Sequence, residues 1–290
     1  MCRLFGMHAG TDPVRATFWL LTAPDSLARQ SRKEADGFGI GTYTRDGTPV
    51  LDKAPIAAYE DVQYAQAARD LESTTFIAHV RYASTGGDTA VNTHPFEQDG
   101  RLLAHNGVVE DLDKLEDRLR QLDVYDLVKG DTDSERVFAL ITGLARTNGG
   151  DITAAIGTAL TWVAENLRLY AVNIILTTAT DLWAVRYPDT HPLYVLQTTG
   201  AETQAEKRTN RISVHSEQMR QEQRPAVLVA TEKMDDDPNW RLLDAGELLH
   251  VDRNLQAERL FPLPDHPQHL ITLADLDAQA AASQHPEKVA

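Results

Sequence analysis

The sequence predicts an α+β fold, for three reasons. Strand-like runs come first, three strongly periodic helices follow between residues 111 and 167, and strand-like runs return from residue 169. Grouping of this kind favours a layered α+β domain over an alternating βαβ sheet. The chain also shows neither a repeat of solenoid or propeller period nor a linker-like segment. We therefore predict one domain over residues 1–277 and a flexible tail over 278–290, where AQAAASQHPEKVA is poor in large apolar side chains.

In the first part of the chain, each expected element has a local signal. The run CRLFGMHAG is short, apolar-rich and ends in Gly, which indicates a strand entering a turn. In DPVRATFWLLTA, Asp12 fits an N-cap and Pro13 suits the first helical position. Asp46 and Gly47 separate two β-rich runs, which predicts a hairpin. The ranges expected here are strands over 2–10, 74–84 and 101–109, a hairpin over 37–54, and helices over 12–23 and 60–71.

The middle of the chain carries the helices and the last part carries strands. In ITAAIGTALTWVAENL, apolar residues recur at i, i+3, i+4 and i+7, which predicts a helix with one buried face. The same period predicts two further helices, over 111–122 and 134–145. The strands expected after them cover 169–180, 182–188, 193–198, 211–216 and 226–232, with two short strands around Gly246.

Composition and charge exclude several classes of function. The formal net charge of −15 opposes binding to nucleic acid or to an anionic membrane surface. A single cysteine excludes a disulfide framework and a thiolate-rich zinc site, and the ten histidines match no metal-ligand spacing. Neither a transmembrane run nor a signal peptide is recognisable. We expect a cytoplasmic protein without metal or cofactor, and the sequence leaves its oligomeric state open.

The single cysteine, Cys2, directly follows the initiator methionine. Removal of Met1 would leave a thiol and a free α-amine on the same residue. Their reference pKa values, about 8.5 and about 7.7–8.0, both lie near neutrality. The amine can therefore serve as general base for the thiol without a histidine partner. Position alone would equally fit a thiol that is merely tolerated near the chain end.

Other segments supply the remaining groups of an acyl-transfer site. Asn106 and Gly107 in AHNGVV offer an amide side chain and an approachable backbone N–H for an oxyanion hole. Arg81 in HVRYAST can bind a carboxylate with two parallel hydrogen bonds. Asp131 and Asp133 in KGDTDSE lie where a helix is expected to begin. Separately these residues fit a turn, a salt bridge and a helix cap, but together they form a complete set.

In this order the motifs resemble those of the class II glutamine amidotransferases, which belong to the N-terminal nucleophile hydrolases. The matching segments are MCRLFG, ADGFGIG, AHVRYAST, NTHPF, AHNGVV and GDTDSE. The resemblance implies a four-layer αββα sandwich, in which two sheets pack face to face between helical layers. It also implies attack by the exposed cysteine on the side-chain amide of glutamine and hydrolysis of the resulting γ-glutamyl thioester to glutamate.

The resemblance assigns a role to each residue that matches a motif. Cys2 is the expected nucleophile, and Asn106 and Gly107 are the expected oxyanion donors. Arg81 is expected to bind the α-carboxylate of the substrate, and Asp133 its α-amino group. Two neighbours within the same motifs, Ser84 and His105, are also expected to contact the substrate.

Departures from the family pattern leave the substrate open. Arg3 stands where the large synthases have Gly, and Thr85 and Gly86 stand where the sugar-phosphate synthases have His. No second synthase domain is expected, so the chain resembles a stand-alone branch that includes the γ-glutamyl hydrolase of ergothioneine biosynthesis. Three alternatives follow: glutamine hydrolysis with ammonia released or passed to a separate protein, hydrolysis of a larger γ-glutamyl amide, and a non-catalytic binding module of the same fold.

Overall fold

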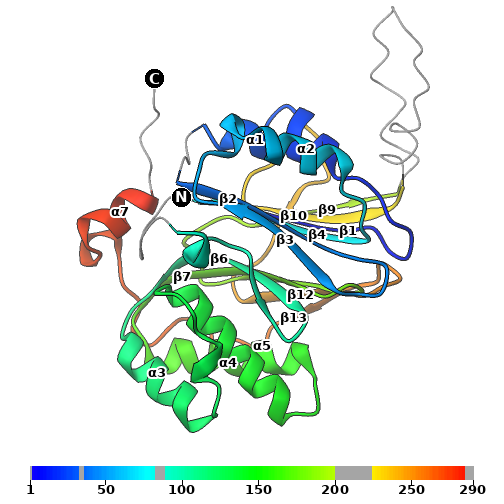
Figure 1. The fold of residues 1–290 in the computed structure, drawn as a ribbon. Helices are drawn as coiled ribbons and strands as arrows, with labels where there is room; N and C mark the ends of the chain where they lie inside the picture. Colours follow the sequence, from blue (N-terminus) through cyan, green and yellow to red (C-terminus); the bar gives the residue numbers. More distant parts are fainter. Residues whose placement is uncertain (1, 33–35, 82–88, 200–223, 285–290) are drawn as a thin grey trace, which may run out of the picture.

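Two antiparallel β-sheets lie face to face in the computed structural model, with helices covering both outer faces (Figure 1). The structure describes residues 2–32, 36–81, 89–199 and 224–284. Within these ranges the layers follow the order helix, sheet, sheet, helix. The four-layer αββα arrangement expected from the sequence is therefore confirmed.

The first sheet contains the N-terminal strand near its centre. Its strand order in the described residues is β11-β9-β10-β1-β4-β2-β3. Strand β1 pairs on one side with β4 and on the other with β10. The strands are β1 (Arg3–His8), β2 (Gly37–Tyr43), β3 (Pro49–Ala54), β4 (Thr75–Arg81), β9 (Tyr194–Thr198), β10 (Ala226–Ala230) and β11 (Arg241–Leu242).

The second sheet contains a long antiparallel pair, β6 and β7. Its order in the described residues is β13-β12-β8-β7-β6-β5. The strands are β5 (Phe96–Gln98), β6 (Arg101–Val109), β7 (Leu169–Thr177), β8 (Leu182–Arg186), β12 (Glu247–Val251) and β13 (Ala257–Leu260).

The helices divide between the two outer faces. One layer packs on the first sheet and consists of η1 (Phe18–Thr22), α1 (Leu27–Gln30) and α2 (Val62–Asp70). The other packs on the second sheet and consists of α3 (Leu112–Gln121), α4 (Asp133–Thr147) and α5 (Ile152–Asn166). Single turns lie at η2 (Ala58–Glu60), η3 (Ala90–Asn92), η4 (Tyr125–Leu127) and η6 (Leu273–Asp275), and α7 (Ala278–Gln284) ends the described chain.

Alternation along the strands explains the layers, because successive side chains point to opposite faces of a sheet. On β1, Leu4 belongs to the apolar cluster between the sheets, whereas Phe5 and Met7 pack toward the helices. On β6, Leu102 faces the space between the sheets and Leu103 faces α4 and its neighbours. Both faces of these central strands are therefore buried.

The GFGIG run of β2 shows how a loop enters between the sheets. Phe38 and Ile40 pack on the helical side, so the alternating Gly39 and Gly41 face the second sheet. A Cβ on Gly39 would lie 2.1 Å from the backbone oxygen of His94 and 2.9 Å from the ring of Pro95. Glycine at this position therefore lets the THP segment pack directly on the strand.

Some elements differ from the expectation. The helix expected over 12–23 is limited to η1, because Val14 exchanges backbone hydrogen bonds with Ser73 and so lies in a β-bridge. Strands β5 and β13 were not predicted. The strand expected over 211–216 lies outside the described residues.

The first half of the segment predicted as a flexible tail is a helix that is buried on one side. Helix α7 packs Ala280 against a cluster that includes Val108 and Ala171 of the central strands. At its end, the side-chain oxygen of Gln284 lies 2.8 Å from Nε2 of His191. The division at residue 277 into a domain and a tail stays a prediction.

Candidate active site

Strand pairing brings the N-terminal cysteine beside Arg81. In the β1–β4 ladder Arg3 pairs with Val80 and Leu4 with His79, so the next step in the register sets Cys2 opposite Arg81. Arg81 is also paired with Gly37 of β2 and is buried. Cys2, Gly37 and Arg81, distant in the sequence, therefore meet at one end of the first sheet.

Asn106 reaches this end of the first sheet from the opposite sheet. On β6, Leu102 and Ala104 face the layer between the sheets, and alternation gives Asn106 the same direction. Its Nδ2 donates a hydrogen bond to the backbone oxygen of Cys2 at 2.5 Å. Its Oδ1 lies 3.2 Å from Nε2 of His79 on β4. The expected oxyanion donor thus adjoins the expected nucleophile.

Two histidine rings line the buried side of this contact. His79 is fully buried, and the centroid of its ring lies 4.3 Å from that of His94 in the THP segment. Burial lowers the pKa of His79 to about 3 and that of His94 well below its usual value, and nearby Arg81 adds to both shifts. Both rings are therefore neutral at physiological pH. We call Cys2, His79, Arg81, His94 and Asn106 the polar cluster.

Gly107 occupies a backbone conformation that only glycine adopts readily. Its φ is +146°, and a Cβ there would lie 1.8 Å from the backbone oxygen of Ala171 on β7. The same Cβ would lie 2.9 Å from Nε2 of His105. The glycine of the HNG motif is therefore demanded both by backbone strain and by the spacing of β6 and β7.

The start of α4 fixes Asp133 against the end of β6. Thr132 caps the helix by accepting a hydrogen bond from the backbone of Glu135. The carboxylate of Asp133 accepts hydrogen bonds from the backbone of Val109 at 2.9 Å and of Ser134 at 2.8 Å. Asp133 is 4 % exposed, so the helix start and the strand end are joined through a nearly buried carboxylate.

His105 and Asn106 point to opposite faces of β6. Nδ1 of His105 lies 2.8 Å from the hydroxyl of Ser134, on the helical side of the sheet. Burial lowers the pKa of His105, and the charge of Asp133 acts in the opposite direction. His105 is therefore associated with Asp133 and Ser134, and the structure does not set its ring beside Asn106.

The NTHPF and GDTDSE motifs are also joined. Oδ1 of Asn92 accepts a hydrogen bond from the backbone of Asp131 at 2.9 Å. A Cβ on Gly130 would lie 2.3 Å from that same oxygen. Glu135 accepts hydrogen bonds from the backbone of Lys129 and Gly130. These contacts hold the loop before α4 close to the loop that carries His94.

Sequence reasoning left one buried polar residue of this region unnoticed. Asn173 pairs with Asn106 across the β6–β7 ladder and is fully buried. It accepts a hydrogen bond from the backbone of Tyr187 and donates to the backbone oxygens of His191 and Pro192. A lone amide within the apolar run LYAVNIILTT was the available signal. Ser84, expected at the site, lies outside the described residues.

Residues 2–32, 36–81, 89–199 and 224–284 contain neither a metal-binding cluster nor a membrane-spanning helix. In those ranges, three or more His, Cys, Asp or Glu side chains do not come together in a group able to hold a metal ion. In the same part of the chain, helices long and apolar enough to cross a membrane are absent.

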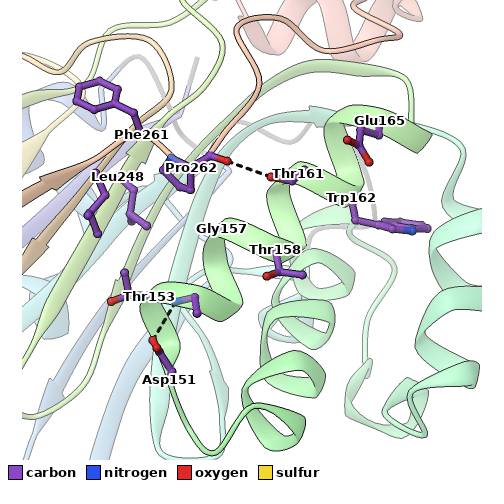
Figure 2. A pocket seen from close by; sticks show the side chains of 12 residues that line it. Asp151, Thr153, Gly157, Thr158, Thr161, Trp162, Glu165, Leu248, Phe261 and Pro262 are labelled. Atoms are coloured by element: carbon purple, nitrogen blue, oxygen red, sulfur yellow. Dashed lines mark hydrogen bonds between the residues drawn. The ribbon is translucent and has the colours of Figure 1, made fainter.

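A separate groove of about 790 Å³ lies on the helical side of the second sheet (Figure 2). It runs between α5 and the segment after β13, where Thr161 donates a hydrogen bond to the backbone oxygen of Pro262. Its apolar lining includes Trp162, Leu248 and Phe261, and neither cysteine nor histidine lines it. None of the site residues expected from the sequence lines this groove.

Comparison with known protein families identifies one family over most of the chain. A family model described as class-II glutamine amidotransferases matches residues 1–268. The chain belongs to this family. The match includes every strand of both sheets and ends before α7.

Curated relatives within the class II glutamine amidotransferases match about half of the chain. The protein named "Probable glutamine amidotransferase DUG3" from Saccharomyces cerevisiae is 32% identical over 161 residues, which cover 48% of this chain and 44% of the yeast protein. A glutamine–fructose-6-phosphate aminotransferase from Corynebacterium glutamicum is 31% identical over 158 residues, which cover 53% of this chain and 25% of the enzyme. The matched region thus spans less than half the length of either relative.

Solved structures support the fold over most of the chain. A glutamine aminotransferase class-II domain protein from Silicibacter pomeroyi has a TM-score of 0.59 at 20% identity, covering 91% of this chain and 100% of that one. The glutamine phosphoribosylpyrophosphate amidotransferase of Bacillus subtilis has a TM-score of 0.62 at 19% identity, covering 89% of this chain and 49% of the enzyme. The shared feature is the two-sheet architecture.

Proposed function

We propose that this protein is a cytoplasmic N-terminal cysteine amidohydrolase that cleaves the side-chain amide of glutamine after Met1 is removed. The observation that carries the proposal is the meeting of Cys2 with Asn106, whose amide donates to the backbone oxygen of the cysteine. Family membership supports the reaction class, and the register that sets Arg81 opposite Cys2 supports the binding of an amino-acid carboxylate nearby.

The proposed reaction has two steps. The thiol of Cys2 transfers its proton to the α-amine of the same residue, and the sulfur attacks the amide carbon of the substrate. The negative charge that develops on the carbonyl oxygen is stabilised by Nδ2 of Asn106 and the N–H of Gly107. Collapse breaks the C–N bond, and the amine returns the proton to the departing ammonia. Water then attacks the thioester and releases glutamate and the thiol.

Substrate recognition is proposed to rest on two charged groups. The guanidinium of Arg81 binds the α-carboxylate with two hydrogen bonds. Asp133 is nearly buried at the start of α4 and binds the α-ammonium group. These groups recognise the amino-acid end of any γ-glutamyl compound. A larger γ-glutamyl amide, as in an ergothioneine-type conjugate, is therefore the alternative substrate, and a separate protein is the proposed acceptor where ammonia is transferred.

The decisive test is the Cys2→Ala variant. We expect glutamate release to fall at least ~10³-fold, because no other group can form the thioester. Circular dichroism and thermal unfolding should match the parent, because the side chain lost is small and only partly buried. Undiminished release by the variant would refute the mechanism. Intact mass provides a companion measurement, since a chain that keeps Met1 would deprive the thiol of its base.

The choice between substrates requires a panel. The purified chain is incubated with glutamine and with γ-glutamyl amides of increasing size, and glutamate is quantified. Turnover of glutamine supports the amidotransferase reaction, whereas turnover of conjugates alone supports the alternative. If the chain turns over neither, the non-catalytic binding module is favoured.

A further inference from the structure

We propose that His79 is a positioning residue for the oxyanion hole: its Nε2–H holds the amide of Asn106 with the NH₂ group turned toward the reacting carbonyl. The inference rests on the proposed function, since it concerns the same site. It assigns His79 a role in the speed of the reaction without contact to the substrate.

The direction of the hydrogen bonds follows from the partners. The backbone oxygen of Cys2 can only accept, so the atom of Asn106 that faces it must be the NH₂ group. Oδ1 of Asn106 is then the atom that faces His79, at 3.2 Å. Because Oδ1 can only accept, Nε2 of His79 must carry the hydrogen. The backbone carbonyl of Cys2 therefore determines both the amide orientation of Asn106 and the imidazole tautomer of His79.

Burial makes this tautomer stable. His79 is fully buried, and within the described part of the chain its Nδ1 has no hydrogen-bond partner. Desolvation keeps the ring neutral, with a pKa lowered to about 3, and the charge of Arg81 opposes protonation further. The neutral ring carries one N–H hydrogen. That hydrogen is most stable on Nε2, because Nε2 faces an acceptor, Oδ1 of Asn106. The donor is therefore present throughout the physiological pH range.

The ring of His79 is also held in place. The ring of His94 packs against it with centroids 4.3 Å apart, and Phe96 packs against His94 at 4.6 Å. The backbone of His94 in turn lies against Gly39 of β2, where no Cβ fits. Gly39, His94 and His79, each from a different motif, thus act together to orient the amide of Asn106.

Loss of the Nε2–H would release the amide of Asn106. Its Oδ1 would lose the hydrogen bond from His79, and the amide could turn its oxygen toward the substrate carbonyl. Removal of one oxyanion donor from an acyl-transfer enzyme costs about 10²–10³ in kcat. Misorientation keeps the donor available part of the time, so we expect a loss of ~10–100-fold in kcat. KM should change less than about threefold, because the oxyanion exists only in the transition state.

The experiment compares His79→Leu with His79→Gln. The amide nitrogen of Gln can donate to Oδ1 of Asn106, whereas Leu fills the space without a donor. We expect the full kcat loss for Leu and recovery of most of it for Gln. His8→Leu is the matched control, because His8 is equally buried at the opposite end of β1 and contacts Thr75 rather than the site. Equal kcat values for parent and His79→Leu, or equal losses in Leu and Gln, would overturn the inference.

A double-mutant cycle with Asn106→Ala separates positioning from general destabilisation. If His79 acts through Asn106, adding His79→Leu to Asn106→Ala should change kcat less than about twofold. Independent effects that multiply would contradict the inference.

The imidazole tautomer gives a readout that needs no turnover. In ¹⁵N-histidine-labelled protein, the resonances of His79, assigned with His79→Gln, should report the neutral Nε2–H form from pH 5 to 8. An Nδ1–H tautomer would refute the inference even in an active enzyme. Conversely, absence of glutamate release with any γ-glutamyl substrate would defeat the proposed function, while the tautomer would still decide whether His79 holds Asn106.

Discussion

The two ends of the layer between the sheets are formed by the same strands and have opposite chemistry. At one end the facing side chains are apolar, with Ile77 in the first sheet and Leu102 in the second. At the other end the same strands carry the polar cluster, including His79 and Asn106. The change occurs over one or two alternating positions along each strand.

This difference shows how a polar site is kept inside a packed layer. Buried polar groups reduce stability unless each finds a hydrogen-bond partner, whereas the apolar end gains stability from every side chain removed from water. The apolar end therefore fixes the separation of the sheets, and the polar cluster uses that fixed separation to bring Asn106 to Cys2. Four predictions test these separate roles of the apolar end and the polar cluster, from the largest effect to the smallest.

Gly107→Ala should have the largest effect, because Gly107 adjoins Asn106 at a point where β6 and β7 leave no space for a side chain. The added Cβ would lie 1.8 Å from the backbone oxygen of Ala171, so β6 and β7 must separate. We expect a loss of roughly 4 kcal/mol or more in the free energy of unfolding, or failure to fold. Urea unfolding of soluble protein measures it. Alanine at the exposed, positive-φ Gly149 is the control and should cost only ~1 kcal/mol.

Leu102→Ala should weaken the apolar end alone. The side chain is fully buried between the sheets, on the same strand as Asn106. We expect a loss of about 2–5 kcal/mol in the free energy of unfolding, with kcat reduced less than twofold where the variant is folded. Denaturant unfolding and glutamate release are measured on the same preparation. A kcat loss as large as that of His79→Leu would contradict the view that the apolar end contributes stability rather than catalysis.

Arg81→Lys should weaken substrate binding more than it slows the chemical step. Lysine keeps the charge but lacks the planar fork that binds a carboxylate with two hydrogen bonds. We expect KM for glutamine to rise ~10-fold or more, equivalent to at least ~1.4 kcal/mol, with kcat less affected. Steady-state kinetics give the result. Arg15→Lys, at a partly exposed ion pair with Glu72, is the control and should leave KM unchanged.

The smallest effect should appear in the pH dependence of stability. Burial lowers the pKa of His79 to about 3 from an unfolded value near 6.5. Below about pH 6.5 His79 binds a proton in the unfolded chain but not in the folded chain. The free energy of unfolding therefore falls as the pH falls toward 3. His79→Gln should remove up to ~1.4 kcal/mol per pH unit from that slope. Urea midpoints at pH 7.5, 6 and 5 measure it, and an unchanged slope would argue against a neutral His79.

Much of the fold was determined by the sequence alone. The periodicity of 152–167 specified α5, and the same signal specified α3 and α4. The turn residues Asp46 and Gly47 between two β-rich runs specified the hairpin of β2 and β3, and the order of strands and helices specified the class. These signals are local, because apolar period, caps and turn residues act within one element. Where tertiary pairing overrode them, as at Val14, the local prediction failed.

The site was recognised from the sequence as a set of motifs, and only the tertiary structure decided their geometry. Sequence reasoning selected Cys2, Arg81, Asn106, Gly107 and Asp133 as chemical groups, but it gave neither their facing directions nor their partners. Strand register set Cys2 opposite Arg81, and the alternation of β6 sent His105 and Asn106 to opposite faces. The link from His79 to Asn106 joins residues of different sheets. Such contacts depend on how two sheets pack, which no local pattern encodes.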